Sequence, residues 1–528
     1  MDEELGWEED LYDNGEAKSV TSEEHNEDDE AALTNNRFSS QHSASDSQYM
    51  SWPQSYKQSM DLLMSMKPPV DDTLERRSLA TSSSSSSFYR RQNTSLFDSA
   101  LCASLLPNSY LGNEDFPSPL KISAEKICCH EQSPNQQCSF TQSVLNGMNV
   151  LCGVGILSVP YAVKGGWMGL AILFLFGVIS CYTGILLKRC LDSSPEVQTY
   201  PDIGEAAFGK IGRLAVAIVL YVELYASCVE YITLMSDNLS SVFPNVHLSF
   251  CGIYLNANYV FSIIATITVL PTVWLRNLSF LSYLSAGGVV ASIVVVVSLL
   301  WVGVVDQVGF HPSGTAIDFS NLPIAIGLYA VCYTGHSVFP NIYTSMEKPS
   351  QFPAVLIVCF TICWLLYTGV AICGFMMFGS SMRSQFTLNM PHQFLASKIA
   401  VWTTVVNPMT KYALTITPVA LSLEELLPAS KQKSYLLSGL IRTLLVFSTL
   451  IVALTVPFFG LVMALIGSFS TMLVALIFPC ACYLMLNRRL SCLEVGICIS
   501  IIIVGLVCCL VGSYSAIMKI VNELYHSN

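Results

Sequence analysis

The sequence predicts an all-α protein that crosses a membrane many times. Its 528 residues are 52% hydrophobic and only 12% charged, a composition more apolar than that of most soluble domains. From Ser139 onward, eleven apolar segments are each long enough to span about 30 Å of hydrocarbon. The preceding residues, 1–137, are acidic and rich in serine, and we expect them to form a disordered cytosolic tail.

Eleven segments imply that the two termini lie on opposite sides of the membrane. We divide the chain into the tail (1–137), a transmembrane domain (138–520) and a short C-terminal tail (521–528). The first span is expected to act as the insertion signal, because no apolar run opens the chain. The approximate limits of the eleven segments are 139–163, 166–187, 213–239, 257–275, 279–305, 321–345, 353–379, 396–423, 435–456, 458–486 and 493–517.

Lysine and arginine in the short loops predict the orientation, since such residues are enriched on the cytosolic side. If the tail is cytosolic, ten basic residues lie in the loops on its side of the membrane and four on the opposite side. The C-terminus is therefore expected outside the cell or in an organelle lumen. The ten are Lys188, Arg189, Lys210, Arg213, Arg276, Lys348, Lys431, Lys433, Arg488 and Arg489. The four are Lys164, Arg383, Lys398 and Lys519.

The tail carries most of the negative charge of the chain. Residues 1–138 hold 24 acidic and 10 basic side chains, whereas residues 139–528 hold 14 and 16. Two arginine pairs, at 76–77 and 90–91, flank serines and threonines, so kinases are possible partners of the tail. Residues 200–209, between the second and third spans, are expected to form a short interfacial helix that ends at Gly209.

The first span contains residues that interrupt a helix. Gly153, Gly155 and Pro160 follow one another inside an apolar stretch at 146–161, where an unbroken helix would favour none of them. Backbone freed by a break cannot face lipid, so it must line a cavity or bind a ligand. The alternative is a continuous helix whose glycines allow a neighbouring helix to pack closely.

A second stretch with the same spacing favours the broken-helix interpretation. Gly335 stands five residues before Pro340, as Gly155 stands five residues before Pro160, and both pairs lie in hydrophobic segments. Paired interruptions in the two halves of a membrane protein are typical of the binding sites of secondary transporters.

Three ionisable residues lie well inside predicted spans: Glu223 and Glu230 in the third, and Lys411 in the eighth. Charges at such depth are costly and are functional candidates. The two glutamates are seven residues apart and so share one helix face. Either Lys411 forms a buried structural ion pair with a glutamate, or these residues carry protons. His336, at the second break, is a candidate proton relay or a hydrogen-bonded packing residue.

With these residues in view, the chain resembles the amino acid/auxin permease family, and most closely its vacuolar amino acid transporter branch. The similarity covers about residues 138–520. It rests on the run Gly153-Val154-Gly155-Ile156-Leu157-Ser158-Val159-Pro160-Tyr161, on Val229-Glu230 with Asp237-Asn238-Leu239, and on Asn407-Pro408 with Lys411-Tyr412-Ala413-Leu414 and Pro418.

The resemblance implies a leucine-transporter-type fold, with a five-plus-five inverted repeat and an eleventh helix. It also implies proton-driven exchange of amino acids, neutral ones in particular, across the vacuolar membrane by alternating access. The partners would be the amino acid, protons and the lipid bilayer, without cofactor, metal or nucleic acid. The expected substrate-binding residues are Asn149, Gly153, Val154, Gly155, Tyr225, Cys332, Tyr333 and Thr334. The expected proton-coupling residues are Glu223, Glu230, His336 and Lys411.

Other functions are less compatible with the sequence. An enzyme is not expected, because no nucleophile with an adjacent base is recognisable. A channel would need a filter or a ring of pore-lining residues. An amino-acid sensor without net transport remains open, since it would keep the same site. A plasma-membrane proton symporter for amino acids or auxin also remains open.

Overall fold

The computed structural model describes residues 52–54, 56–57, 59–60, 138–250, 253–275, 287–311, 314–428, 434–487 and 489–527. Apart from Trp52, they all belong to one compact unit, Pro53–Asn528. Most of the predicted tail, including both arginine pairs, lies outside the described residues. The described residues of 53–60, which belong to the predicted tail, are part of this unit. This differs from the expectation that the whole tail is disordered.

The first predicted span consists of two helices, as the glycines and proline indicated. α4 (Phe140–Leu151) and α5 (Gly155–Ala162) are bent by 54° where they meet. A capping box fixes the start of α4: the Ser139 hydroxyl accepts from the Gln142 amide, and the Gln142 side chain accepts from the Ser139 amide.

The third predicted span begins with the expected interfacial helix. α7 (Tyr200–Val242) starts at a second capping box, formed by Thr199 and Asp202. Gly209, with φ of 67°, interrupts the helical backbone in a conformation that favours glycine. α7 therefore has a short first part and a long apolar part. A hairpin of two antiparallel strands, β1 (Leu248–Phe250) and β2 (Ile253–Leu255), connects it to α8 (Ala257–Trp274).

The remaining helices follow the other predicted segments. α19 extends to Ser527, so residues 521–527 continue a helix and do not form the separate C-terminal tail that was expected. The other α-helices, together with the π-helix η6, are α6 (Gly169–Leu191), α10 (Gly288–Val304), α11 (Leu322–Val331), α12 (Phe339–Ser345), α13 (Phe352–Phe378), α14 (Leu395–Glu425), α16 (Tyr435–Thr455), α17 (Phe459–Ile466), η6 (Gly467–Ile477), α18 (Phe478–Leu486) and α19 (Cys492–Ser527). The short 3-10 helices are η2 (Val163–Gly165), η3 (Pro349–Gln351), η4 (Gly379–Ser381) and η5 (Phe386–Asn389).

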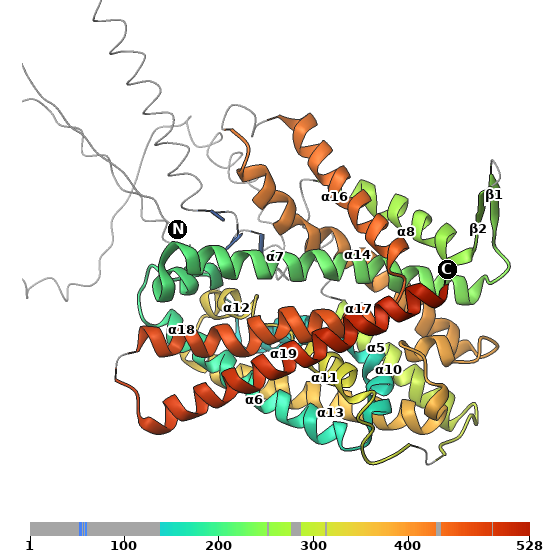
Figure 1. Ribbon diagram of the computed structural model, residues 1–528, viewed down its shortest axis with the longest axis horizontal. Helices are drawn as coiled ribbons and strands as arrows, with labels where there is room; N and C mark the ends of the chain where they lie inside the picture. Colours follow the sequence, from blue (N-terminus) through green and yellow to red (C-terminus); the bar gives the residue numbers. More distant parts are fainter. Residues whose placement is uncertain are drawn as a thin grey trace, which may run out of the picture. The chain divides into compact units, whose positions relative to one another are not determined.

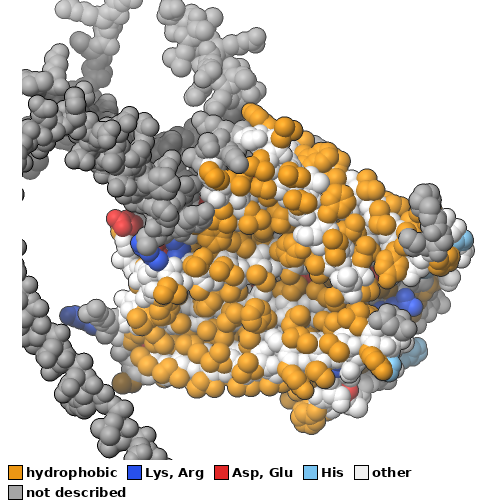
Figure 2. All heavy atoms as spheres, turned by 45° about the horizontal axis from the view of Figure 1, so that its top comes forward, with side chains coloured by type: hydrophobic (Ala, Val, Ile, Leu, Met, Phe, Trp, Pro, Cys, Tyr) orange, Lys and Arg blue, Asp and Glu red, His pale blue; other side chains and the backbone are white. Residues whose placement is uncertain are grey.

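Helices overlap all eleven predicted segments, but not all of them meet the criteria for a span by length and apolar composition. Among the described residues, seven helices do, or eight if α4 and α5 count as one bent span. Figure 1 shows α7 and α19 running across the molecule in the same general direction. The face shown in Figure 2 carries a broad band of hydrophobic side chains, with lysine and arginine at its two ends. Such a surface is expected of a multi-pass membrane protein, because its spans are surrounded by the hydrocarbon of the bilayer and not by water.

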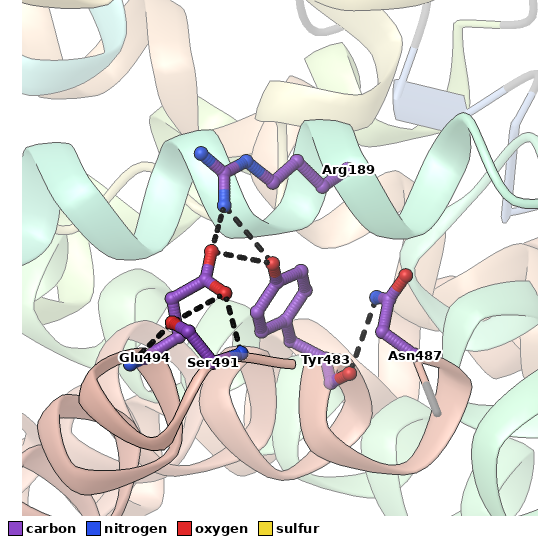
Figure 3. Close-up of polar contacts among 5 residues, drawn as sticks. All are labelled: Arg189, Tyr483, Asn487, Ser491 and Glu494. Carbon is purple, nitrogen blue, oxygen red and sulfur yellow. Dashed lines mark hydrogen bonds and ion pairs between the residues drawn. The ribbon is translucent and has the colours of Figure 1, made fainter. Parts of the chain in front are cut away.

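The last turn of α6 carries Lys188 and Arg189, and α7 carries Lys210 and Arg213 just after Gly209; we call this end of the unit the basic end. Here Arg189, on α6, donates to the Tyr483 hydroxyl of α18 at 2.9 Å and to the Glu494 carboxylate of α19 at 3.1 Å (Figure 3). Ser491 caps α19 through the same carboxylate, with its amide and hydroxyl 3.2 Å and 3.0 Å from Oε2. The cluster fixes the C-terminal ends of α6 and α18 against the start of α19.

Candidate functional site

The first helix break lies at residues 152–154, between α4 and α5. Three neighbouring elements hold its backbone carbonyls. The Tyr367 hydroxyl of α13 donates to the Leu151 carbonyl, and the Ser292 hydroxyl of α10 donates to the Cys152 carbonyl at 3.0 Å. Lys411, on α14, donates from Nζ to the Asn149 carbonyl at 3.4 Å. The carbonyls of Asn149, Leu151 and Cys152 are therefore satisfied by side chains from the protein interior, as is required of backbone in a membrane.

Two of the three predicted amide donors are available at this break. The Gly153 amide donates to the Leu151 carbonyl at 2.8 Å. The amides of Val154 and Gly155 donate to no acceptor among the described residues, and the Val154 side chain does not cap α5. These amides form the positive end of the α5 dipole, where an anion is favoured.

The second break separates α11 from α12 at residues 332–338. The amides of Tyr333 and Thr334 turn back to the carbonyls of Ala330 and Val331, at 3.0 Å and 3.2 Å. The carbonyls of Cys332, Tyr333 and Thr334 accept no hydrogen bond from the described part of the chain. Buried carbonyls normally have a partner, so this backbone is suited to a hydrogen-bond donor such as an ammonium group.

The two breaks meet directly. A β-carbon placed on Gly155 would lie 3.3 Å from the Cα atom and 3.4 Å from the sulfur of Cys332. Cys332 is 1% exposed and Gly155 is buried. Glycine is therefore required at 155 for close packing of the two breaks. The sequence left open a helix break or close packing of a neighbouring helix, and both occur at Gly155.

Lys411 places a cation beside the first break. Besides its contact with the Asn149 carbonyl, its ammonium group would lie 3.0 Å from a β-carbon on Gly288 of α10. The same β-carbon would lie 2.5 Å from the side-chain oxygen of Asn149. Asn149, Gly288 and Lys411 therefore form one contact among α4, α10 and α14, and only glycine leaves room for it at 288.

A small cavity adjoins the first break on the side of α7, α10 and α14. Gly153 and Val154, both predicted as substrate-binding residues, lie in its wall. The other lining residues are mainly apolar, with three hydroxyl groups and one amide among them. They are Ile156, Leu157, Leu234, Ala291, Ser292, Val295, Thr403, Thr404, Asn407 and Pro408.

Glu223 and Glu230 are both buried in α7, at 4% and 3% exposure. Neither forms an ion pair with Lys411, so the structural pair considered from the sequence is absent between these three described residues. One carboxylate oxygen of each glutamate has no hydrogen-bond partner in the described structure. Unpaired buried carboxyl groups are costly unless they bind a proton or a ligand.

Glu223 is connected to the second break through the π-helix η6. Thr471 of η6 faces the Glu223 carboxyl group, and its hydroxyl lies 3.0 Å from that of Thr334. π-Helices frequently mark functional sites. The sequence analysis did not select Thr471, although a serine and threonine cluster at 468–471 in an otherwise apolar segment was a signal that pointed to it.

His336 lies at the second break but faces α6. Its Nε2 atom lies 3.1 Å from the Ser180 carbonyl and 3.0 Å from the Thr183 hydroxyl. Because a carbonyl only accepts, Nε2 is assigned the hydrogen, which leaves Nδ1 as an acceptor; this atom has no partner among the described residues. The ring also packs on Phe339, with centroids 4.8 Å apart. These contacts fit the packing alternative better than the relay.

Two predicted pocket residues do not line the cavity at the first break. The Tyr225 hydroxyl donates to Ser448 of α16 at 2.9 Å. Tyr333 is fully buried, and its ring packs against Phe360 and Tyr367 of α13, with centroids 5.7 Å and 5.9 Å apart. Neither side chain lines the cavity beside Gly153, whereas the backbone of Tyr333 remains part of the second break.

Comparison with known proteins identifies the family of this chain. The chain matches the family described as transmembrane amino acid transporter protein over residues 136–518. Amino acid transporter AVT1D of Arabidopsis thaliana is 54% identical over 516 residues, which cover 94% of this chain and 92% of that protein. Amino acid transporter AVT1J of the same plant is 41% identical, over 76% and 96% of the two chains. The vesicular inhibitory amino acid transporter of Xenopus laevis is 26% identical, over 75% and 80%. These matches confirm the family predicted from the motifs: the chain belongs to the transmembrane amino acid transporter family, in its AVT1 branch.

Proposed function

We propose that this chain is a secondary active transporter that moves amino acids, neutral ones in particular, across the vacuolar membrane in exchange for protons. The main support is the meeting of two broken helices at Gly155 and Cys332, which brings unpaired amides and unpaired carbonyls together. A free amino acid carries one anionic and one cationic group, so it complements both kinds of backbone. The names of the relatives support the same substrate class.

In this proposal the substrate bridges the two breaks. Its carboxylate meets the amides of Val154 and Gly155, with Gly153 leaving space beside them. Its ammonium group meets the carbonyls of Cys332, Tyr333 and Thr334. The cavity wall near Asn407 and Thr404 would then contact the substrate side chain. Alternating access follows if the two breaks open first to one side of the membrane and then to the other.

Proton coupling is assigned to Lys411 and to the two glutamates of α7. Lys411 is in contact with the first break and Glu223 is connected through Thr471 to the second, so both breaks have an ionisable neighbour. Glu230 lies on the same face of α7 as Glu223 and has an unpaired carboxylate oxygen. The driving force is the proton gradient, and no cofactor takes part.

We further propose eleven spans with a five-plus-five inverted repeat and a cytosolic tail. Cys138, just before α4, exchanges backbone hydrogen bonds with Ser345 and Glu347. Nearby, the Tyr343 hydroxyl donates to Asp192, which lies close to the basic end. Lys519, near the C-terminus, bonds Asn321 at the start of α11. Entry at one end and exit at the other favour an odd number of spans. Protease cleavage of both termini from the same face of sealed vesicles would exclude this topology.

Uptake by the purified full-length protein in liposomes tests the function. With an acidic lumen, labelled neutral amino acids should accumulate against their gradient as protons leave. Binding without accumulation, at any pH gradient, would favour the amino-acid sensor. A tagged full-length protein in the plasma membrane, with uptake coupled to inward proton flow, would favour the symporter for amino acids or auxin.

A further inference from the structure

Four of the six described residues of 53–60 are buried, although they belong to the acidic tail, whereas Gln54 is exposed and Lys57 is partly exposed. Tyr56 is 1% exposed, Ser59 1% and Met60 0%. They form part of the same compact unit as the helices and lie beside α7 and α12, where Figure 1 draws them in blue. The tail therefore places the large side chains of Tyr56 and Met60 inside the helical domain, where their burial is favourable.

Tyr56 reaches the candidate site itself. Its hydroxyl donates to the Ser337 carbonyl at 3.0 Å, and Ser337 is part of the second break. Its ring packs edge-on against Tyr221 of α7, with centroids 6.1 Å apart. Tyr56 therefore lies between α7 and the second break. A buried tyrosine with its hydroxyl bonded is a well-defined anchor.

Polar contacts on either side of Tyr56 fix the segment at the basic end. They come from α7, α12, the C-terminal end of α14 and the loop before α7, so the segment is held on several sides. Arg213 donates to the Pro53 carbonyl at 3.2 Å, and the Gln54 amide donates to Glu425 at 3.0 Å. Lys57 donates to Gln198 at 2.6 Å, and Asn341 donates to the Lys57 carbonyl at 3.3 Å.

We infer that the basic end holds a binding site for a peptide and that the described residues of 53–60, with Tyr56 at their centre, are its occupant and close the path from this side to the second break. The inference rests on the proposed function, because it assigns a regulatory state to the same site. Transport requires the segment to leave, since Tyr56 lies between α7 and the second break. The tail, which the sequence predicts to be disordered, thus contains an inhibitory segment.

Photocrosslinking tests the binding site without any substrate. The full-length chain is made with p-benzoylphenylalanine in place of Tyr56, illuminated in liposomes and digested. Crosslinks to the peptides containing Tyr221 or Ser337 are expected. The same probe at Tyr254, which is 68% exposed on β2, should give neither. Absence of both crosslinks from position 56 would refute the binding site.

Transport rates test the inhibition. Full-length Tyr56→Ala should transport at least threefold faster than the parent when substrate is added at the basic end, and Tyr56→Phe, which loses only the hydroxyl, should be intermediate. A synthetic peptide of residues 50–63 should return Tyr56→Ala to the parental rate, whereas the same peptide carrying Tyr56→Ala should not. A Tyr56→Ala rate equal to or below that of the parent would refute the inhibition. Crosslinking without transport by any variant would refute the proposed function and leave the binding site supported.

Discussion

The ammonium group of Lys411 lies 3.4 Å from the carbonyl oxygen of Asn149, in the last turn of α4. The C-terminal end of a helix carries the negative end of the dipole, so a cation is favourable there. Lys411 therefore places a removable positive charge at the point where α4 gives way to the first break. Protonation or deprotonation of this one group changes the electrostatics of the break directly.

Replacement of Lys411 by methionine should abolish the response to a proton gradient. Lys411→Met keeps a long side chain but removes the charge and the donor to Asn149. We expect pH-driven accumulation to fall at least tenfold, while exchange of amino acids across the membrane at equal pH continues. Lys398→Met, at an exposed position in the first turn of α14, is the matched control and should behave like the parent. Undiminished accumulation by Lys411→Met would exclude this lysine from coupling.

Glu230→Gln should separate exchange from proton coupling in the same way. Glutamine has almost the volume of glutamate, and the carboxylate makes no ion pair with Lys411 that the change would break. We therefore expect normal protein yield, continued exchange and at least a tenfold loss of pH-driven accumulation. Glu347→Gln, at an exposed position after α12, controls for the loss of one negative charge. If Glu230→Gln accumulates substrate as the parent does, the proton route must avoid Glu230.

The helix breaks could be predicted from the sequence, because the residues that cause them lie at the breaks themselves. Gly153, Gly155 and Pro160 disfavour a continuous helix wherever they occur, and the structure confirms a break between α4 and α5. Gly209 likewise ends the interfacial helix because its φ is positive. The family could also be predicted, since motifs around Gly155 and Lys411 are contiguous in sequence.

Contacts between distant segments could not be predicted in this way. Nothing near Tyr225 in the sequence shows that its hydroxyl faces Ser448, 223 residues later. The packing of Tyr56 against Tyr221 depends on where the folded helices leave an opening, which composition does not encode. The sequence also left open whether Lys411 pairs with a glutamate, because spacing along a chain does not set distances between helices.

His336 should affect stability more than pH dependence. His336→Asn removes the hydrogen bond from Nε2 to Ser180 and the packing on Phe339, and should cost about 1–3 kcal/mol of unfolding free energy. The pH profile of transport should keep its midpoint. Thermal unfolding in detergent and uptake at several pH values measure the two effects. His392→Asn, at an exposed position, should change neither. A shifted pH midpoint with unchanged stability would favour the proton relay instead.

The substrate site is tested most directly at Gly153. At Gly155 a side chain would crowd the backbone of Cys332, so Gly155→Val should reduce amino-acid binding at least about tenfold, or roughly 1.4 kcal/mol. This loss would combine disturbed packing of the two breaks with obstruction of the substrate carboxylate, so it would not isolate the substrate site. At Gly153 a β-carbon would meet only the Val150 carbonyl, at an ordinary 3.7 Å, and would enter the cavity.

Gly153→Val should therefore fold like the parent and still lose at least about tenfold in amino-acid affinity. Gly369→Val, on the exposed face of α13 with nothing within 4 Å of an added β-carbon, is the matched control for a glycine-to-valine change inside a membrane helix. Binding of a labelled neutral amino acid to the purified proteins, together with their thermal unfolding, gives both quantities. If Gly153→Val binds as tightly as Gly369→Val and the parent, the amides at the first break do not contact the substrate, and the break serves only the packing of α5 against α11.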